Sequence, residues 1–196
     1  MRLLAEGRAS EIYALDDERV LRRFKTGGNP EREARVMKRA LDHGYPVPRV
    51  YEVLEDGMVI ERIHGPSMFE DLARRPEHIG VHAEALAALH NELHRIPGES
   101  GGTLLHLDLH PHNVLMPASG PVVIDWANAR EGPPAVDAAL TWVICMTSAG
   151  EAGRRFADAF ARHIDVRSGL EQAAAFRLRD RNVSEEERQA VERLLS

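Results

Sequence analysis

The sequence predicts an α+β fold of two lobes, in which a small antiparallel β-sheet with one helix precedes a mainly helical lobe. Two observations support this prediction. Residues 1–63 contain short runs of strand-forming residues separated by turn residues, which is typical of antiparallel strands. Residues 64–196 contain longer segments with apolar residues at helical spacing, interrupted by a short apolar β-like insert. We therefore expect an N-terminal lobe over 1–63 and a C-terminal lobe over 64–196.

The strands of the first lobe are expected at 3–8, 11–15 and 20–24, followed by a hairpin of 50–54 and 58–63 around a Glu-Asp-Gly turn. One helix lies between them in the sequence. Pro30 suits its first turn and Asn29 its N-cap, while Gly44 is suited to end it. The second lobe follows a linker at 64–67. Its helices are expected at 68–74, 77–94, 134–147, 150–163, 169–179 and 184–195.

The amino-acid composition and charge of the chain argue against several classes of protein. The 196 residues are 43% hydrophobic and 29% charged, with a net charge of −6, which is typical of a soluble globular protein. No basic cluster indicates a nucleic-acid partner, and no apolar stretch is long enough to predict a membrane span. The lone Cys145 lies in an apolar run, so we expect a buried, unreactive thiol and a cytoplasmic protein. Oligomeric state is left open.

The most specific signal is the stretch HLDLHPHN at 106–113, followed by the apolar run VVI and Asp125. It places Asp108, then Asn113, then Asp125 along one short segment. Phosphoryl transfer from ATP uses such a set: one carboxylate orients the attacking hydroxyl, while a carboxamide and a second carboxylate hold Mg²⁺. A carboxylate at the end of an apolar strand also needs a cation or hydrogen-bond partner. We therefore expect Asp108 to be catalytic and Asn113 and Asp125 to bind Mg²⁺.

The motifs LDLHP at 107–111, NVL at 113–115 and IDW at 124–126 resemble those of the aminoglycoside phosphotransferase superfamily, small-molecule kinases with a protein-kinase-like fold. The resemblance covers most of the chain and is weakest after residue 150. It implies that Asp137 steadies the catalytic loop from beneath and that His106 is a packed structural residue of that loop. It also implies ATP and Mg²⁺ as cofactors and a small-molecule hydroxyl as the acceptor.

The resemblance assigns nucleotide contacts to the first lobe. Gly7 and Ser10 belong to a short glycine loop that would lie over the phosphates, although an ordinary hairpin would look the same. Strand alternation puts Val20 and Arg22 on one face, where they would contact adenine and the phosphates. Glu33 would pair with the basic residue of that strand, or would be a solvated helix glutamate. The hinge to the second lobe is expected at 61–63, with Glu61 and Ile63 near the nucleotide.

Arg22 departs from the family pattern, in which a lysine is expected. The arginine guanidinium binds phosphate through two N–H groups at once, but it is bulkier than the lysine ammonium, so the two residues are not equivalent. This substitution and the minimal glycine loop leave a nucleotide-binding pseudokinase or scaffold as an alternative. An atypical protein kinase is a further alternative. The segment between Asp125 and Pro134 is short where protein kinases carry a long activation segment, which favours a small acceptor.

The histidines permit a different interpretation. His106, Asp108, His110 and His112 alternate like the ligands of a metal hydrolase, and His90 and His94 lie one helical turn apart. This interpretation leaves Asn113, Asp125 and Glu33 unexplained. The sequence therefore favours an ATP- and Mg²⁺-dependent phosphotransferase acting on a small molecule, with Trp126 and Trp142 as potential walls of its acceptor pocket.

Overall fold

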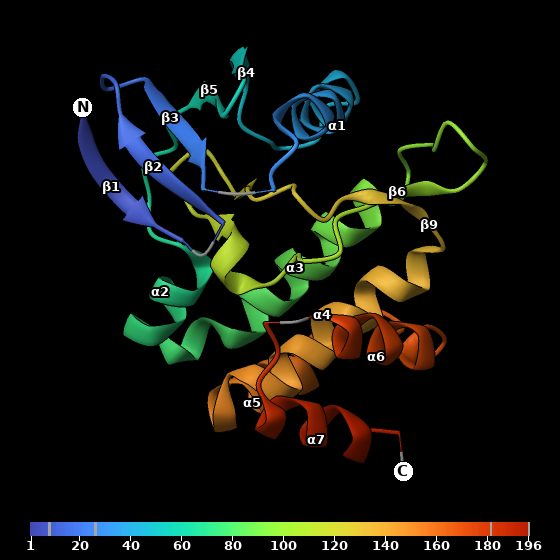
Figure 1. The fold of residues 1–196 in the computed structure, drawn as a ribbon. Coiled ribbons are helices and arrows are strands. Elements are labelled where there is room, and N and C mark those ends of the chain that lie inside the picture. Colours follow the sequence, from blue (N-terminus) through green and yellow to red (C-terminus); the bar gives the residue numbers. More distant parts are fainter. Residues whose placement is uncertain (8, 26, 181, 196) are drawn as a thin grey trace. The chain divides into compact units, whose positions relative to one another are not determined.

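The computed structural model describes residues 1–7, 9–25, 27–180 and 182–195 (Figure 1). The chain forms two compact units. The first contains Met1–Ser67 and Val114–Ala129, and the second contains Met68–Asn113 and Arg130–Ser196. This division differs from a single boundary after residue 63, because the segment 114–129 groups with the N-terminal residues. No helix in the described part of the chain is both long and apolar enough to cross a bilayer.

The first unit is built on a five-stranded antiparallel sheet with the order β1-β2-β3-β5-β4. Its strands are β1 (Arg2–Glu6), β2 (Ser10–Ala14), β3 (Arg19–Phe24), β4 (Val50–Leu54) and β5 (Gly57–Glu61). The central strand β3 pairs with both β2 and β5, so that Arg22 lies opposite Ile12 on one side and Met58 on the other. All five expected strands are present. Arg8, which falls in the expected strand 3–8 and in the glycine loop, lies outside the described residues.

Helix α1 (Pro30–Asp42) packs against β4 and β5 of this sheet (Figure 1). The Asn29 side chain accepts a hydrogen bond from the Arg32 N–H, as expected of an N-cap. The apolar stripe of Ala34, Met37 and Ala40 is buried. The chain leaves the helix through Gly44, whose φ of 78° lies in the left-handed region that favours glycine.

A two-stranded ribbon explains why 114–129 belongs to the first unit. Strands β7 (Val114–Leu115) and β8 (Val122–Val123) pair with each other. The Val123 N–H also donates to the Pro46 carbonyl, and the Met116 N–H donates to the Pro66 carbonyl. These bonds attach the ribbon, and with it Asp125, to the first unit.

The second unit is mainly helical, as expected, and contains one short antiparallel β-pair of β6 (Thr103–Leu105) with β9 (Arg130–Gly132). Its other elements are α2 (Met68–Arg74), the 3-10 turns η1 (Pro76–His78) and η2 (Pro111–Asn113), α3 (Ile79–Leu93), α4 (Pro134–Ser148), α5 (Gly150–Phe160), α6 (Leu170–Arg179) and α7 (Glu185–Arg193). Leu140, Val143, Ala173 and Val191 bring α4, α6 and α7 together in the apolar core.

Most boundaries differ from the sequence prediction by one or two residues, and two elements differ in a way that has a structural reason. Helix α5 ends at Phe160 instead of residue 163, because the N–H groups of Arg162 and His163 bond to carbonyls three residues back and tighten the final turn. The expected helix 77–94 begins with the 3-10 turn η1 before α3. The β6–β9 pair was not predicted, since strands of three residues are too short to show an alternating pattern.

Candidate active site

Arg22 is the centre of a buried ionic cluster in the first unit. Its side chain projects from β3, and the residue is only 5% exposed. One terminal nitrogen lies 2.6 Å from Asp125 Oδ1, the other contacts Glu33 Oε1, and Nε donates to Ser10 Oγ at 3.2 Å. The planar fork of arginine makes these three contacts simultaneously, which the single ammonium of lysine could not do with the same directions.

Glu33 is the buried partner of Arg22 and is not a solvated helix glutamate. It lies on the first turn of α1, is 3% exposed, and also accepts the Trp126 backbone N–H at 3.1 Å. Burial raises the pKa of its carboxyl, while Arg22 and the Trp126 N–H act in the opposite direction. The same contact brings the β8–Trp126 segment to α1.

Val20 and Arg22 lie on the same face of β3, as the alternation predicted. Both are 5% exposed, while the intervening Leu21 is half-buried and Arg23 is exposed. Gly7 is exposed, and its N–H donates to the Ser10 carbonyl at 2.9 Å, closing the turn between β1 and β2. Ser10 thus lies beside the Arg22 cluster.

The expected hinge residues lie at the end of β5. The Glu61 carboxylate accepts the Arg49 N–H at 3.1 Å, so it has a local structural partner. Ile63 is half-buried. Their contact with a nucleotide stays a prediction.

Asp125 has a backbone φ of 64°, a left-handed conformation that is uncommon for residues other than glycine, asparagine and aspartate. Its side chain is 45% exposed, in contrast to the buried Arg22 and Glu33. The Arg22 contact occupies Oδ1 and leaves Oδ2 as the oxygen available to a cation.

The catalytic-loop candidates meet in the second unit. The Asn113 amide donates to the Asp108 backbone carbonyl at 2.9 Å and to its carboxylate at 3.2 Å. His110 Nε2 lies 3.3 Å from the other carboxylate oxygen. Because Asn113 uses its nitrogen on Asp108, its carbonyl oxygen is the atom suited to a metal ion.

Asp108 keeps its negative charge and some access to solvent, since 27% of its side chain is exposed. Burial by itself would raise the pKa of this carboxyl. The hydrogen bond from His110 and the charges of His110 and His106 outweigh that effect, and the pKa lies below its ordinary value. The group is therefore a carboxylate at neutral pH and can accept a hydrogen bond from a hydroxyl.

Asp137 braces the loop from α4. It is fully buried, and its two oxygens accept the backbone N–H groups of His106 at 2.9 Å and Leu107 at 2.7 Å. Leu107 has a φ of 60°, so these bonds fix a strained turn directly before Asp108. His106 is completely buried. Asp137 therefore holds the backbone of residues 106 and 107, and the catalytic function of the loop that follows stays a prediction.

His90 of α3 and His94, the residue that follows the helix, make further contacts with Asp137 and α4. His94 Nε2 lies 3.1 Å from Asp137 Oδ2, and His90 Nε2 lies 3.0 Å from the Thr141 hydroxyl. That hydroxyl in turn donates to the Leu109 carbonyl at 2.6 Å. The 106–113 loop is thus attached to α3 and α4 through buried polar groups.

One sequence expectation needs correction. Trp126 is completely buried, with its ring edge-on to Tyr45 and its N–H donating to the Val123 carbonyl, so it cannot line an open acceptor pocket. The alternating strip of His106, Asp108, His110 and His112, which the sequence did not favour as a metal site, does not form a ligand group among the described residues. Among the described residues, groups of three or more potential ligands occur only at Asp71-His78-His82 and at His90-His94-Asp137.

The Asp71 cluster was missed by sequence reasoning. The spacing of four residues between His78 and His82 was the signal that could have indicated it. The direct contact between Arg22 and Asp125 was also missed, since the two residues are more than 100 positions apart in the sequence.

Comparison with known proteins identifies the family. The sequence model described as "Phosphotransferase enzyme family" matches residues 99–176, and the model described as "RIO domain" matches residues 13–135, more than half of the chain. A search of curated protein sequences found no match.

Similar solved structures include a streptomycin–ATP complex of APH(2")-IIa, with a TM-score of 0.61 and 14% identity over 99% of this chain and 90% of that one. The ADP-bound aminoglycoside phosphotransferase APH(2'')-Ib has a TM-score of 0.60 and 15% identity over 100% and 91%. A choline/ethanolamine kinase family protein from Mesorhizobium loti has a TM-score of 0.63 and 16% identity over 98% and 85%. These likenesses show a kinase-like fold. The RIO domain model covers more than half of the chain, so the chain belongs to the RIO domain family, and the phosphotransferase family model matches its middle part.

Proposed function

We propose that this protein is an ATP- and Mg²⁺-dependent phosphotransferase that transfers the γ-phosphate to a hydroxyl of a small molecule. The observation that carries the proposal is the Asp108–Asn113 pair. It joins an ionised, partly exposed carboxylate to an amide on one loop, and Asp137 fixes the backbone of that loop. Phosphoryl transfer depends mainly on positioning and charge stabilisation, and such a rigid loop supplies positioning.

Asp108 accepts the hydrogen bond of the acceptor hydroxyl and orients its oxygen for attack. The Asn113 amide and the His110 ring hold both carboxylate oxygens of Asp108 in place. The carboxylate of Asp108 is therefore already oriented when the substrate hydroxyl binds, so little conformational entropy of this side chain is lost during the reaction.

Asp125 and Asn113 supply hard oxygen donors, one carboxylate and one amide carbonyl, which is the ligand type that Mg²⁺ prefers. The exposure of Asp125 and its free Oδ2 fit this role. Bound Mg²⁺ would neutralise charge on the phosphate oxygens. In this proposal Arg22, held by Glu33, supplies a fixed positive charge for the phosphates, while Val20 offers an apolar surface to the base.

The test measures ADP release with ATP and Mg²⁺ across a panel of aminoglycosides, aminoalcohols and sugars. Asp108→Asn keeps the shape of the side chain and removes its charge, so we expect turnover to fall about 10²–10⁴-fold while ATP binding is retained. Asp158→Asn, at an exposed position on α5, is the matched control. Unchanged turnover in Asp108→Asn would contradict the role given to Asp108.

A nucleotide-binding pseudokinase is the second candidate, and the Arg22–Asp125 contact favours it. An arginine 2.6 Å from the expected metal ligand competes with a cation for that carboxylate. This candidate predicts thermal stabilisation by ATP without ADP release for every acceptor tested. An atypical protein kinase, with a protein hydroxyl as acceptor, is the third candidate, and the RIO domain match is compatible with it. Labelled phosphate on lysate proteins that disappears with Asp108→Asn would identify it.

A further inference from the structure

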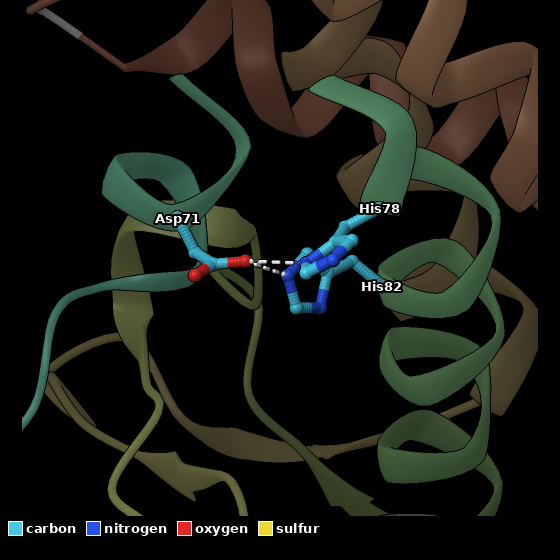
Figure 2. Close-up of side chains that lie close together, drawn as sticks. All are labelled: Asp71, His78 and His82. Atoms are coloured by element: carbon cyan, nitrogen blue, oxygen red, sulfur yellow. Dashed lines mark hydrogen bonds and ion pairs between the residues drawn. The ribbon is translucent and has the colours of Figure 1, made fainter. Parts of the chain in front are cut away.

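A second group of potential ligands lies in the second unit, apart from the catalytic loop. Asp71 projects from α2, His78 is the last residue of η1, and His82 lies in the first turns of α3 (Figure 2). His82 Nε2 lies 2.7 Å and His78 Nδ1 lies 3.0 Å from the same oxygen, Asp71 Oδ2. Figure 2 shows the carboxylate directed at both imidazole rings. Three donor atoms from three consecutive elements thus converge on one point.

The spacing of these atoms suits a small transition-metal ion. One ligand atom from each residue lies within 4.8 Å of the other two. Around a tetrahedral Zn²⁺ with bonds of about 2.0–2.1 Å, neighbouring ligand atoms are about 3.3 Å apart. The two distances from Asp71 Oδ2 therefore need to lengthen by only a few tenths of an ångström to admit the ion.

The surroundings also fit a metal centre. Asp71 is 3% exposed, and its other oxygen, Oδ1, is held by the Arg75 guanidinium, which fixes the carboxylate plane as outer partners of metal ligands do. The pKa of Asp71 is held well below its usual range by hydrogen bonds from His82, Arg75 and His78. His82 is buried, and its Nε2 atom is the ring nitrogen that faces Asp71 Oδ2. The side chain of His78 is 35% exposed and gives an ion access from solvent.

The comparable group at His90, His94 and Asp137 differs in its hydrogen bonds and in its exposure. Both oxygens of Asp137 already accept backbone N–H groups, and His90 Nε2 is bonded to Thr141. Its three side chains are at most 9% exposed. The His90 group is therefore a structural network. In the Asp71 group, by contrast, both histidines face the same carboxylate oxygen, Asp71 Oδ2, and the partly exposed His78 gives an ion a path from solvent.

We propose that Asp71, His78 and His82 form a Zn²⁺ site, with Asp71 Oδ2, His78 Nδ1 and His82 Nε2 as ligands and water completing the shell. Two imidazoles and one carboxylate are a ligand set that Zn²⁺ takes with one position left open. This site is separate from the Mg²⁺ ligands assigned above, and soft nitrogen donors distinguish it from an oxygen-only Mg²⁺ site.

Occupancy would connect α2 firmly to α3. Two residues before Asp71 on the same helix, Phe69 stacks on the ring of His112, with ring centroids 3.8 Å apart. His112 directly precedes Asn113 in the turn η2. Zn²⁺ at this site would therefore also steady the turn that carries Asn113.

The test uses the full chain with any affinity tag removed, stripped of metal by a chelator and titrated with Zn²⁺ in the absence of nucleotide. We expect one Zn²⁺ per chain by calorimetry and elemental analysis. His78→Ala removes a partly exposed ligand and should weaken binding at least tenfold. His163→Ala, an exposed histidine on the turn after α5, is the matched control and should bind as the wild type does. Equal affinity in His78→Ala and His163→Ala would overturn the proposal.

A second measurement does not depend on how the variants fold. Co²⁺ added to the stripped wild-type protein should give the visible absorption of a tetrahedral nitrogen- and oxygen-ligated ion, and Zn²⁺ should abolish it. Absence of that absorption together with absence of Zn²⁺ binding would show that the cluster is only an ion-pair network. Asp108→Asn should bind Zn²⁺ normally, so failure of this site and failure of the proposed transferase activity are separable.

Discussion

Replacing Arg22 with methionine tests whether the buried ionic cluster stabilises the first unit. Methionine has a similar length but no charge, so Arg22→Met leaves the Glu33 carboxylate buried, with the Trp126 N–H as its one remaining partner among the described residues. Breaking a buried ion pair by removing one member costs about 3–5 kcal/mol. Asp125 adds little to this cost, because 45% of its side chain is exposed and water can replace Arg22 there.

The measurement is equilibrium unfolding by urea, with the thermal midpoint as a second readout. A loss of 3–5 kcal/mol should lower the midpoint by about 6–20 °C for a chain of this size. Arg23→Met is the matched control on the same strand. Its ion pair with Asp56 is exposed on both sides, so this variant should lose at most about 1 kcal/mol.

A double variant separates the unpaired charge from the lost packing. In Arg22→Met with Glu33→Gln, the amide carries no charge and its carbonyl still accepts the Trp126 N–H. We expect the double variant to be about 2 kcal/mol more stable than Arg22→Met alone, because the desolvated charge is gone. The reasoning is refuted if Arg22→Met is no less stable than Arg23→Met, or if the double variant gains nothing.

Three further predictions concern other parts of the chain. Asp137→Ala should destabilise the protein by about 2–6 kcal/mol in urea unfolding, because the buried N–H groups of His106 and Leu107 each lose their acceptor at a cost of about 1–3 kcal/mol; a loss below 1 kcal/mol would contradict it. Ser184→Ala should cost about 1 kcal/mol and speed amide exchange in the first turn of α7, whose capping box it removes; unchanged exchange would argue against that cap. Burial raises the pKa of Cys145 to about 12, so iodoacetamide at pH 8 should leave the native thiol unmodified by mass spectrometry while labelling the urea-unfolded chain; rapid native labelling would contradict the burial.

Most of the elements could be predicted from local sequence. Asn29 before Pro30, and Ser184 before three glutamates, define helix starts through capping chemistry that involves only neighbouring residues. Strand alternation likewise placed Val20 and Arg22 on one buried face of β3. These features are local, so the residues that determine them lie within one turn or one strand of each other.

The sequence could not show which residues far apart in the chain contact each other. The β7–β8 ribbon groups with the first unit because its backbone bonds to residues near Pro46 and Pro66. Arg22 meets Asp125 across 103 positions, and Asp71 meets two histidines from the following elements. Such contacts depend on how elements pack, and nothing in their local spacing specifies that packing.

The sequence by itself determined most of the element types, the kinase-like pattern and the candidates Asp108, Asn113 and Asp125, because capping, alternation and motif spacing each depend on residues that lie close together in the chain. Only the tertiary structure decided the partners of those residues. It buried Glu33 against Arg22, directed Asp137 to the backbone before Asp108, and brought a carboxylate and two imidazoles together at Asp71. Charge, burial and hydrogen bonding act through space, and they become fixed only when segments far apart in the chain are packed.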